Sequence, residues 1–174
     1  MVRKPVPGAV RQDNWFVLLD PKWQASSPGE VPPAAVIAGG WLLDEAGETG
    51  PFQPNPDYAP RDPSTPTDPT DAVLRLIADG EQLGEQLVQA LCDSVVQIAC
   101  DRNNAPVVGS APDGLACVFV ATAMAHQHGV SADRWWPVVG AELPGIVPAG
   151  ADILLNPGGP AEFRLVTDAL RRAD

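Results

Sequence analysis

The two histidines, His126 and His128, are the side chains whose ordinary pKa suits them to proton transfer and metal binding near neutral pH. One residue separates them, so they would share a face on a strand but diverge on the helix or turn expected here. No cysteine or glutamate stands at a spacing that would complete a metal site. We therefore expect no bound metal, and we interpret both histidines as exposed polar residues that end a short helix.

Three aspartates, Asp62, Asp68 and Asp71, suggest a calcium loop at first sight. An EF-hand loop needs oxygen ligands at alternate positions, a central glycine and a terminal glutamate, whereas prolines occupy much of this segment. Helix capping explains Asp68 and Asp71 instead, because Pro69 suits the first helical position and Asp71 lies near the positive helix end. The pattern predicts a helix that begins after Asp68 and binds no ion.

The glycine-rich segment 156–160 is a candidate phosphate cradle, and Cys117 is a candidate nucleophile. The segment lacks the Gly-Lys-Ser/Thr ending of a P-loop and joins two predicted strands. A tight turn with positive φ at Gly158 and Gly159 therefore explains it. No G-x-S-x-G motif is present, and Cys117 would need a base that the sequence does not place beside it. We assign no catalytic residue and expect a protein that is not an enzyme and needs no cofactor.

The aromatic residues give the best candidates for a binding surface. Trp135 and Trp136 are neighbours on a predicted strand, so their rings point to opposite faces, one buried and one nearer the surface. Phe52 and Tyr58 stand in a proline-rich loop, where a restricted backbone loses little entropy on binding. We predict that Phe52, Tyr58 and one of the two tryptophans form a partner-binding surface. The alternative is that these rings fasten the loop to its own domain.

The formal net charge of −11, from 11 basic and 22 acidic residues, makes nucleic acid an unsuitable partner. A nucleic-acid binder needs a cationic face, and the basic residues here are scattered. No run of eighteen apolar residues is present, so we expect no membrane insertion. Residues 1–10 hold Pro5 and Pro7 instead of the apolar run of a signal peptide. The three cysteines form no C-x-x-C pair, and together these features predict a cytoplasmic protein with free thiols.

The elements that must position these residues alternate along the chain. Apolar runs predict strands and amphipathic runs predict helices, so we expect one α/β (α+β) domain with helices packed on a single mixed sheet. Strands are predicted at 15–19, 35–43, 94–99, 106–108, 115–122, 135–139, 151–155 and 162–166. Helices are predicted at 69–79, 83–91 and 168–172, with a further short helix between the strands 115–122 and 135–139.

The domain is expected to span residues 14–174, with residues 1–13 as a flexible tail. The proline-rich loop 50–69 cannot pair as a central strand, because proline lacks the backbone donor. Four apolar residues from different predicted elements should lie in the core: Leu18, Leu76, Val118 and Leu154.

The C-terminal part of the chain resembles the SseB-like domain, a small α/β domain of bacterial accessory proteins. The resemblance rests on residues 115–122, LACVFVAT, followed by a short helix, and on residues 152–160, DILLNPGGP. The segment 120–122 reads VAT where the family usually has a strand ending near FTS. The LNPGGP turn is the more specific of the two matches, and the resemblance implies an SseB-like α/β fold.

Residues 13–172 as a whole are similar to the type VII secretion system-associated proteins of high-GC Gram-positive bacteria. The matching segments are NWFVLLDP at 14–21 with Trp23, GGW at 39–41, GPFQPNPDY at 50–58, PTDP at 66–69 with Asp71 and Ala72, and the LNPGGP turn. The resemblance implies an accessory role near a secretion locus and supplies no active site.

The leading hypothesis is therefore a cytoplasmic, non-enzymatic interaction protein whose protein partner is a secretion-system component or substrate. One alternative is a small ligand-binding domain or enzyme that uses a pocket beside the sheet. Another is an immunity-type protein that binds a secreted toxin, for which acidity would suit a basic target.

Overall fold

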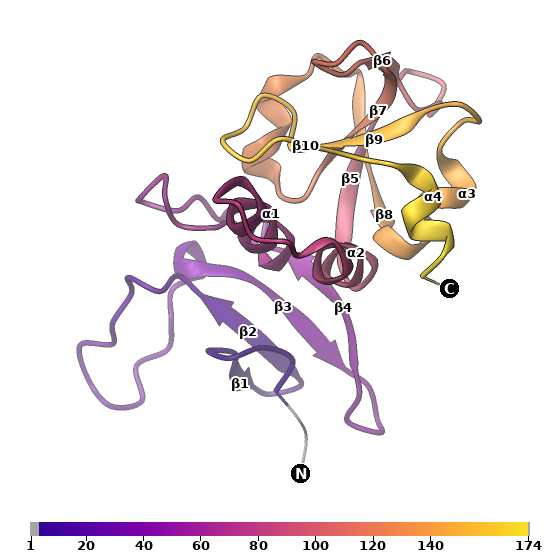
Figure 1. Cartoon of the computed structure of the whole chain (residues 1–174). Coiled ribbons are helices and arrows are strands. Elements are labelled where there is room, and N and C mark those ends of the chain that lie inside the picture. The colour runs from indigo at the N-terminus through magenta and orange to yellow at the C-terminus, as the bar shows by residue number, and fades with distance from the viewer. Residues whose placement is uncertain (1–3, 174) are drawn as a thin grey trace.

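The protein has a mixed α+β fold, built from two β-sheets with helices between and around them (Figure 1). The structure is a computed structural model, and it describes residues 4–173. The α+β class is confirmed, but the expectation of a single sheet is wrong. The elements in chain order are β1 (Val10–Gln12), β2 (Trp15–Leu19), a 3₁₀ helix (Ala34–Val36), β3 (Ile37–Leu43), β4 (Thr49–Pro54), α1 (Pro69–Ala78), α2 (Gly84–Cys92), β5 (Val95–Cys100), β6 (Val108–Ser110), β7 (Ala116–Ala121), η2 (Met124–Gly129, a 3₁₀ helix), β8 (Arg134–Val139), a 3₁₀ helix (Gly140–Glu142), α3 (Leu143–Ile146), β9 (Asp152–Leu155), β10 (Phe163–Leu165) and α4 (Thr167–Arg171).

The N-terminal sheet is antiparallel, with strand order β1-β2-β3-β4. Its buried cluster contains Phe16, Trp41 and Phe52 from three neighbouring strands, and the rings of Trp41 and Phe52 lie 4.7 Å apart between centroids. A Cβ on Gly39 would lie 2.5 Å from Cζ of Phe52, so only glycine lets this ring lie against β3. The sheet thus has a small aromatic core of its own.

The C-terminal sheet has the order β10-β9-β7-β5-β8, with β6 paired to β7. Its pairs are antiparallel except for β7 and β9, which run parallel with Val118 opposite Ile153. The main core packs one face of this sheet against the helices, through buried side chains such as Leu74 of α1, Leu91 of α2 and Leu170 of α4.

The two sheets are joined through β4 and the start of β5. Phe52 forms an isolated parallel bridge with Ser94, and the backbone N–H of Phe52 donates to the carbonyl oxygen of Asp93 at 2.7 Å. Helices α1 and α2 lie between the sheets (Figure 1). Because β4 reaches both sheets, the N-terminal strands are held against the rest of the molecule by backbone as well as side-chain contacts.

Three expectations need correction. Residues 10–12 form β1 and Ala9 is fully buried, so this part of the expected tail is ordered, while residues 1–3 lie outside the described region. Residues 50–54 of the proline-rich segment belong to β4, the last strand of the N-terminal sheet, and are not a loop. Leu76 is 47% exposed, because α1 turns Thr70, Asp71 and Leu74 inward instead.

The other three residues predicted for the core are wholly or partly buried. Val118 and Leu154 are buried as predicted, and Leu18 is half-buried. No helix within residues 4–173 has the length and hydropathy needed to cross a bilayer.

Candidate functional site

A network of buried polar side chains centres on Asp68, the N-cap of α1. Its Oδ1 accepts from the backbone N–H of Asp71 at 2.9 Å. Its Oδ2 accepts from the hydroxyls of Thr67 at 2.6 Å and Thr122 at 2.7 Å. Capping by Asp68 was predicted from local sequence and is confirmed, whereas the bond from Thr122, 54 positions away, comes from the tertiary fold.

The strand ends place Thr122 and Asn156 beside this cap. Thr122 follows β7 and Asn156 follows β9, and the carboxyl ends of parallel strands meet at the same sheet edge, where α/β proteins often place their sites. The backbone N–H of Thr122 donates to Oδ1 of Asn156 at 2.9 Å, and Nδ2 of Asn156 donates to the Thr122 hydroxyl at 3.0 Å. Asn156 has a φ of 49°, which its short polar side chain tolerates well.

His126 also belongs to the network, so the prediction that it is exposed is wrong; His128 is exposed as predicted. Nε2 of His126 lies 2.9 Å from the Thr67 hydroxyl and 3.7 Å from Oδ1 of Asp71. Since the Thr67 hydrogen is donated to Asp68, the hydroxyl accepts from the imidazole. Gly129, in the same 3₁₀ helix as His126, lies tightly against the LNPGGP turn, because a Cβ there would lie 1.9 Å from the carbonyl oxygen of Pro157.

The two carboxylates of the network have different environments. Burial raises the pKa of Asp68, the negative charge of Asp71 raises it further, and hydrogen bonds from Thr67, the Asp71 backbone and Thr122 oppose the increase. Oδ2 of Asp71 accepts from Nε of Arg75 at 2.8 Å and from the Thr67 backbone at 3.0 Å. Oδ1 of Asp71 is buried and has no hydrogen-bond partner.

The network contains acid, base and hydroxyl groups, but its geometry favours a structural role. The side chains of Asp68, Asp71, Thr67, Thr122, His126 and Asn156 are all buried and bond mainly to one another. A nucleophile or base must reach the proton or atom on which it acts, and these groups face other members of the network. Among residues 4–173, no three His, Cys, Asp or Glu side chains are arranged to hold a metal ion.

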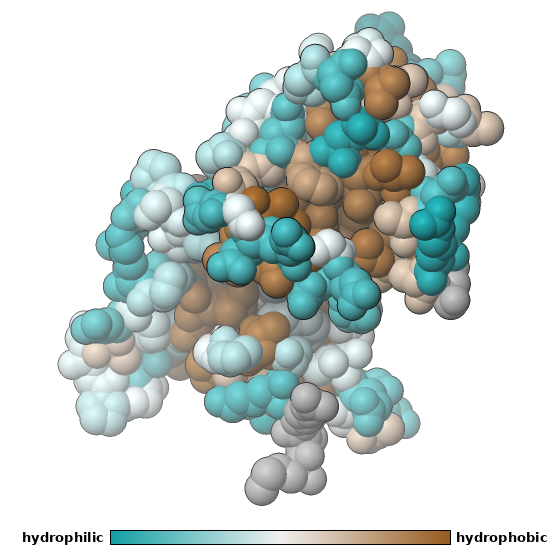
Figure 2. Space-filling view, viewed as in Figure 1, coloured by the Kyte–Doolittle hydropathy of each residue, from teal (hydrophilic) through white to brown (hydrophobic). Residues whose placement is uncertain are grey.

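A cavity of about 640 Å³ opens beside this network, between the N-terminal sheet and α1; we call it the α1 cavity. Figure 2 shows hydrophobic surface gathered in the hollow between that sheet and the helices. The lining of the α1 cavity is mainly apolar, and its polar side chains include Asp20, Tyr58, Thr65 and Asp68. The apolar lining comes from Val6, Pro7, Leu18, Leu19, Pro21, Trp23, Ala38, Pro66, Pro69, Ala72, Val73 and Ala90.

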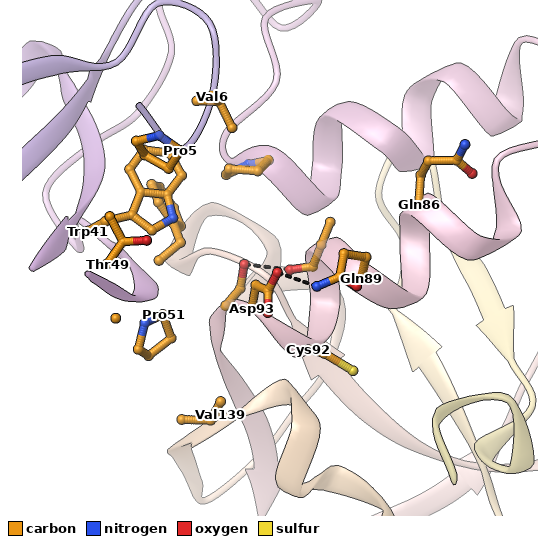
Figure 3. A pocket seen from close by; sticks show the side chains of 15 residues that line it. Pro5, Val6, Trp41, Thr49, Pro51, Gln86, Gln89, Cys92, Asp93 and Val139 are labelled. Carbon is orange, nitrogen blue, oxygen red and sulfur yellow. Dashed lines mark hydrogen bonds between the residues drawn. The ribbon is translucent and has the colours of Figure 1, made fainter. Parts of the chain in front are cut away.

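A second cavity of about 630 Å³ lies between β4 and α2, and we call it the α2 cavity (Figure 3). Trp41, Pro51 and Val139 line it together with Gln89 and Asp93, whose side chains hydrogen-bond to each other. Both cavities are lined by Val6, Pro69 and Ala90. The two cavities therefore adjoin and follow one seam between the N-terminal sheet and the α1–α2 layer.

The structure separates the four residues predicted to form a partner surface. Phe52 is 1% exposed and Tyr58 is 5% exposed, so both rings lie inside the molecule, where Phe52 lines the α2 cavity and Tyr58 lines the α1 cavity. Trp136 is 51% exposed and Trp135 is half-buried on β8, which ends the C-terminal sheet. Neither tryptophan lines either cavity. Phe52 is buried because the segment around it, expected as a loop, forms the strand β4, which contacts both sheets.

Sequence reasoning missed Asp20 and Trp23 as site residues. Both residues belong to the segment that resembles the secretion-associated family, but that resemblance gave neither of them a binding role. Both line the α1 cavity, and Oδ2 of Asp20 accepts from the Tyr58 hydroxyl at 3.1 Å. Burial, reinforced by this bond and by the Asp20 charge, raises the pKa of Tyr58.

Comparison with protein-family models, curated proteins and solved structures finds no significant match to the chain.

Proposed function

We propose that this protein is a non-enzymatic binding protein that holds a segment of another protein along the seam formed by the α1 and α2 cavities. The observation that carries the proposal is the pair of adjoining cavities, each more than 600 Å³, between two separately cored layers. Binding sites in proteins are commonly concave and apolar, with a few polar groups that fix orientation.

The shape of the seam supports a chain segment as its occupant. The cavities share Val6, Pro69 and Ala90, so a ligand that fills both must be elongated. Six prolines line them, including Pro5 and Pro7, and a backbone restricted in this way loses little entropy when a partner binds. An extended peptide with apolar side chains meets both requirements.

The proposal also includes where the protein acts and which class of protein it binds. The similarity to type VII secretion system-associated proteins supports a cytoplasmic accessory role, with a secretion-system component or substrate as the partner. The internal bonding of the Asp68 network supports binding over catalysis, because its acid and base groups are already paired inside the fold.

Site-specific photocrosslinking in the native bacterium tests the proposal. A photoreactive amino acid at Val73, which lines the α1 cavity, should capture a defined protein that is identified by mass spectrometry. The matched position is Val31, which is 77% exposed in the loop before β3 and should not capture that protein. Equal capture at both positions, or no capture at Val73, would contradict the proposal.

A second candidate function is the binding of a small apolar molecule in the α1 cavity alone. Its support is the size of that cavity, which falls in the range of about 300–1,000 Å³ typical of ligand pockets. Native mass spectrometry of the protein purified from its own host distinguishes the two. A stoichiometric small molecule lost on Val73→Trp, which fills the cavity, would favour this candidate.

A further inference from the structure

One end of the α1 cavity holds a buried carboxylate without a cationic partner. Asp20 is 7% exposed, and its oxygens accept from the Tyr58 hydroxyl at 3.1 Å and from the backbone N–H of Lys22 at 2.9 Å. None of the ion pairs within residues 4–173 includes Asp20. A carboxylate has about four acceptor sites, so this one retains capacity for further donors.

The nearby cations do not neutralise this charge. The ammonium of Lys22 pairs with Asp62, and Arg61 is exposed in a neighbouring cavity that also reaches Asp20 and Trp23. A buried carboxylate is costly unless a cation or several donors compensate it. The missing positive charge is therefore one that a ligand can supply.

The aromatic lining suits the same kind of ligand. Trp23 and Tyr58 both line the α1 cavity together with Asp20. Aromatic faces attract ammonium and guanidinium groups, most strongly when water is excluded. The carboxylate and the two rings thus favour a cation at this end, while Leu18, Ala72 and other apolar side chains line the remainder.

The charges along the seam point the same way. Asp20, Asp68 and Asp93 are the charged residues that line the two cavities, and the described lining contains no lysine or arginine. The chain as a whole carries a formal net charge of −11. An acidic segment would be repelled by these charges, and a strongly polar segment would lose its hydration without compensation.

We infer that the seam takes a partner segment with a lysine or arginine beside apolar side chains, and that Asp20, Trp23 and Tyr58 bind the basic group. This inference rests on the proposed function and specifies the chemistry of its partner. Asp20 sets the preference for a positive charge, and the apolar lining of the α1 cavity accepts the flanking side chains.

Three labelled hexapeptides test the charge preference on the wild-type protein, so this comparison depends on no variant folding. They alternate leucine with lysine, glutamine or glutamate, and fluorescence anisotropy measures their dissociation constants at low and at high salt. The lysine peptide should bind at least about tenfold more tightly than the other two, with the difference reduced by salt. Equal binding of all three, or no binding by any, would overturn the inference.

Two matched aspartate variants separate the site from the overall negative charge. Asp20→Asn should weaken the lysine peptide about tenfold, whereas Asp79→Asn, the same charge change at an exposed position, should alter it less than about twofold. Tyr58→Phe keeps the ring and the carboxylate, so it should retain the binding. Equal effects of Asp20→Asn and Asp79→Asn would show general attraction and overturn the inference, as would a Tyr58→Phe variant that loses binding like Asp20→Asn.

A failure of the cation site can be distinguished from a failure of the proposed function. If Val73 captures a native partner but the hexapeptides show no charge preference, the binding function stands and the cation site is wrong. If Val73 captures nothing while the lysine peptide binds through Asp20, the cation site stands without a protein partner.

Discussion

The hydroxyl of Thr122 donates a 2.7 Å hydrogen bond to Oδ2 of Asp68, although the two residues are 54 positions apart. This bond connects the end of β7 to the first turn of α1, and both residues are buried. The bond holds α1, which forms one wall of the α1 cavity, in place against the C-terminal sheet.

Thr122→Val should destabilise the fold by about 1–3 kcal/mol, because it leaves a buried carboxylate with one donor fewer and Nδ2 of Asn156 without its acceptor. The side chain keeps its shape, so packing changes little. Urea unfolding measures the free energy. The control Thr49→Val, at an exposed position on β4, should change it by less than about 0.5 kcal/mol, and equal losses would contradict the role of the network.

Asp68→Asn should reduce the dependence of stability on pH. The pKa of Asp68 is raised in the folded state, so the unfolded chain ionises first as pH rises above the ordinary value of 3.8. The wild-type protein therefore loses stability between that pH and the raised pKa. Asparagine still caps the helix but cannot ionise.

Unfolding free energies at a series of pH values from 4 upward check this prediction. The difference between Asp68→Asn and wild type should shift in favour of the variant as pH rises. A difference that stays constant with pH would mean that Asp68 does not titrate in this way.

Gly129→Ala should destabilise the protein by about 1–3 kcal/mol, because the added Cβ would lie 1.9 Å from the carbonyl oxygen of Pro157. The displaced turn would also disturb His126, which lies in the same 3₁₀ helix. Gly145→Ala is the matched control, since a Cβ there meets no atom within 4 Å. Thermal unfolding should show a lower Tm for Gly129→Ala alone; similar Tm values would refute the close contact.

Phe52→Ala should cost about 3–5 kcal/mol, as expected for removing a fully buried aromatic ring. Phe52 contacts Trp41, and its backbone bridges to β5, so the loss affects the join between the sheets. Trp136→Ala removes an exposed ring and should cost far less. Calorimetry compares the stabilities of the two variants. A Phe52→Ala variant as stable as Trp136→Ala would contradict the structural role of Phe52.

Local patterns in the sequence determined the elements and several of their ends. Asp68 and Pro69 predicted the start of α1, and Gly158 has the positive φ of 72° expected in the LNPGGP turn. The positive φ expected at Gly159 is wrong, and Asn156 adopts one instead, at 49°. The apolar runs predicted β2, β5, β7 and β9 closely. These features depend on neighbouring residues, whose steric and capping preferences act within a few positions.

Only the tertiary structure decided how those elements pair and which side chains meet. The sequence did not indicate that β4 would end one sheet and contact another, that Leu76 would face solvent, or that His126 would be buried. The contact between Asp20 and Tyr58 joins residues 38 positions apart, and no local preference encodes it. Strand pairing and the inward face of a helix are chosen by the total burial of the whole chain, so the cavity and its unpaired carboxylate became visible only in the folded molecule.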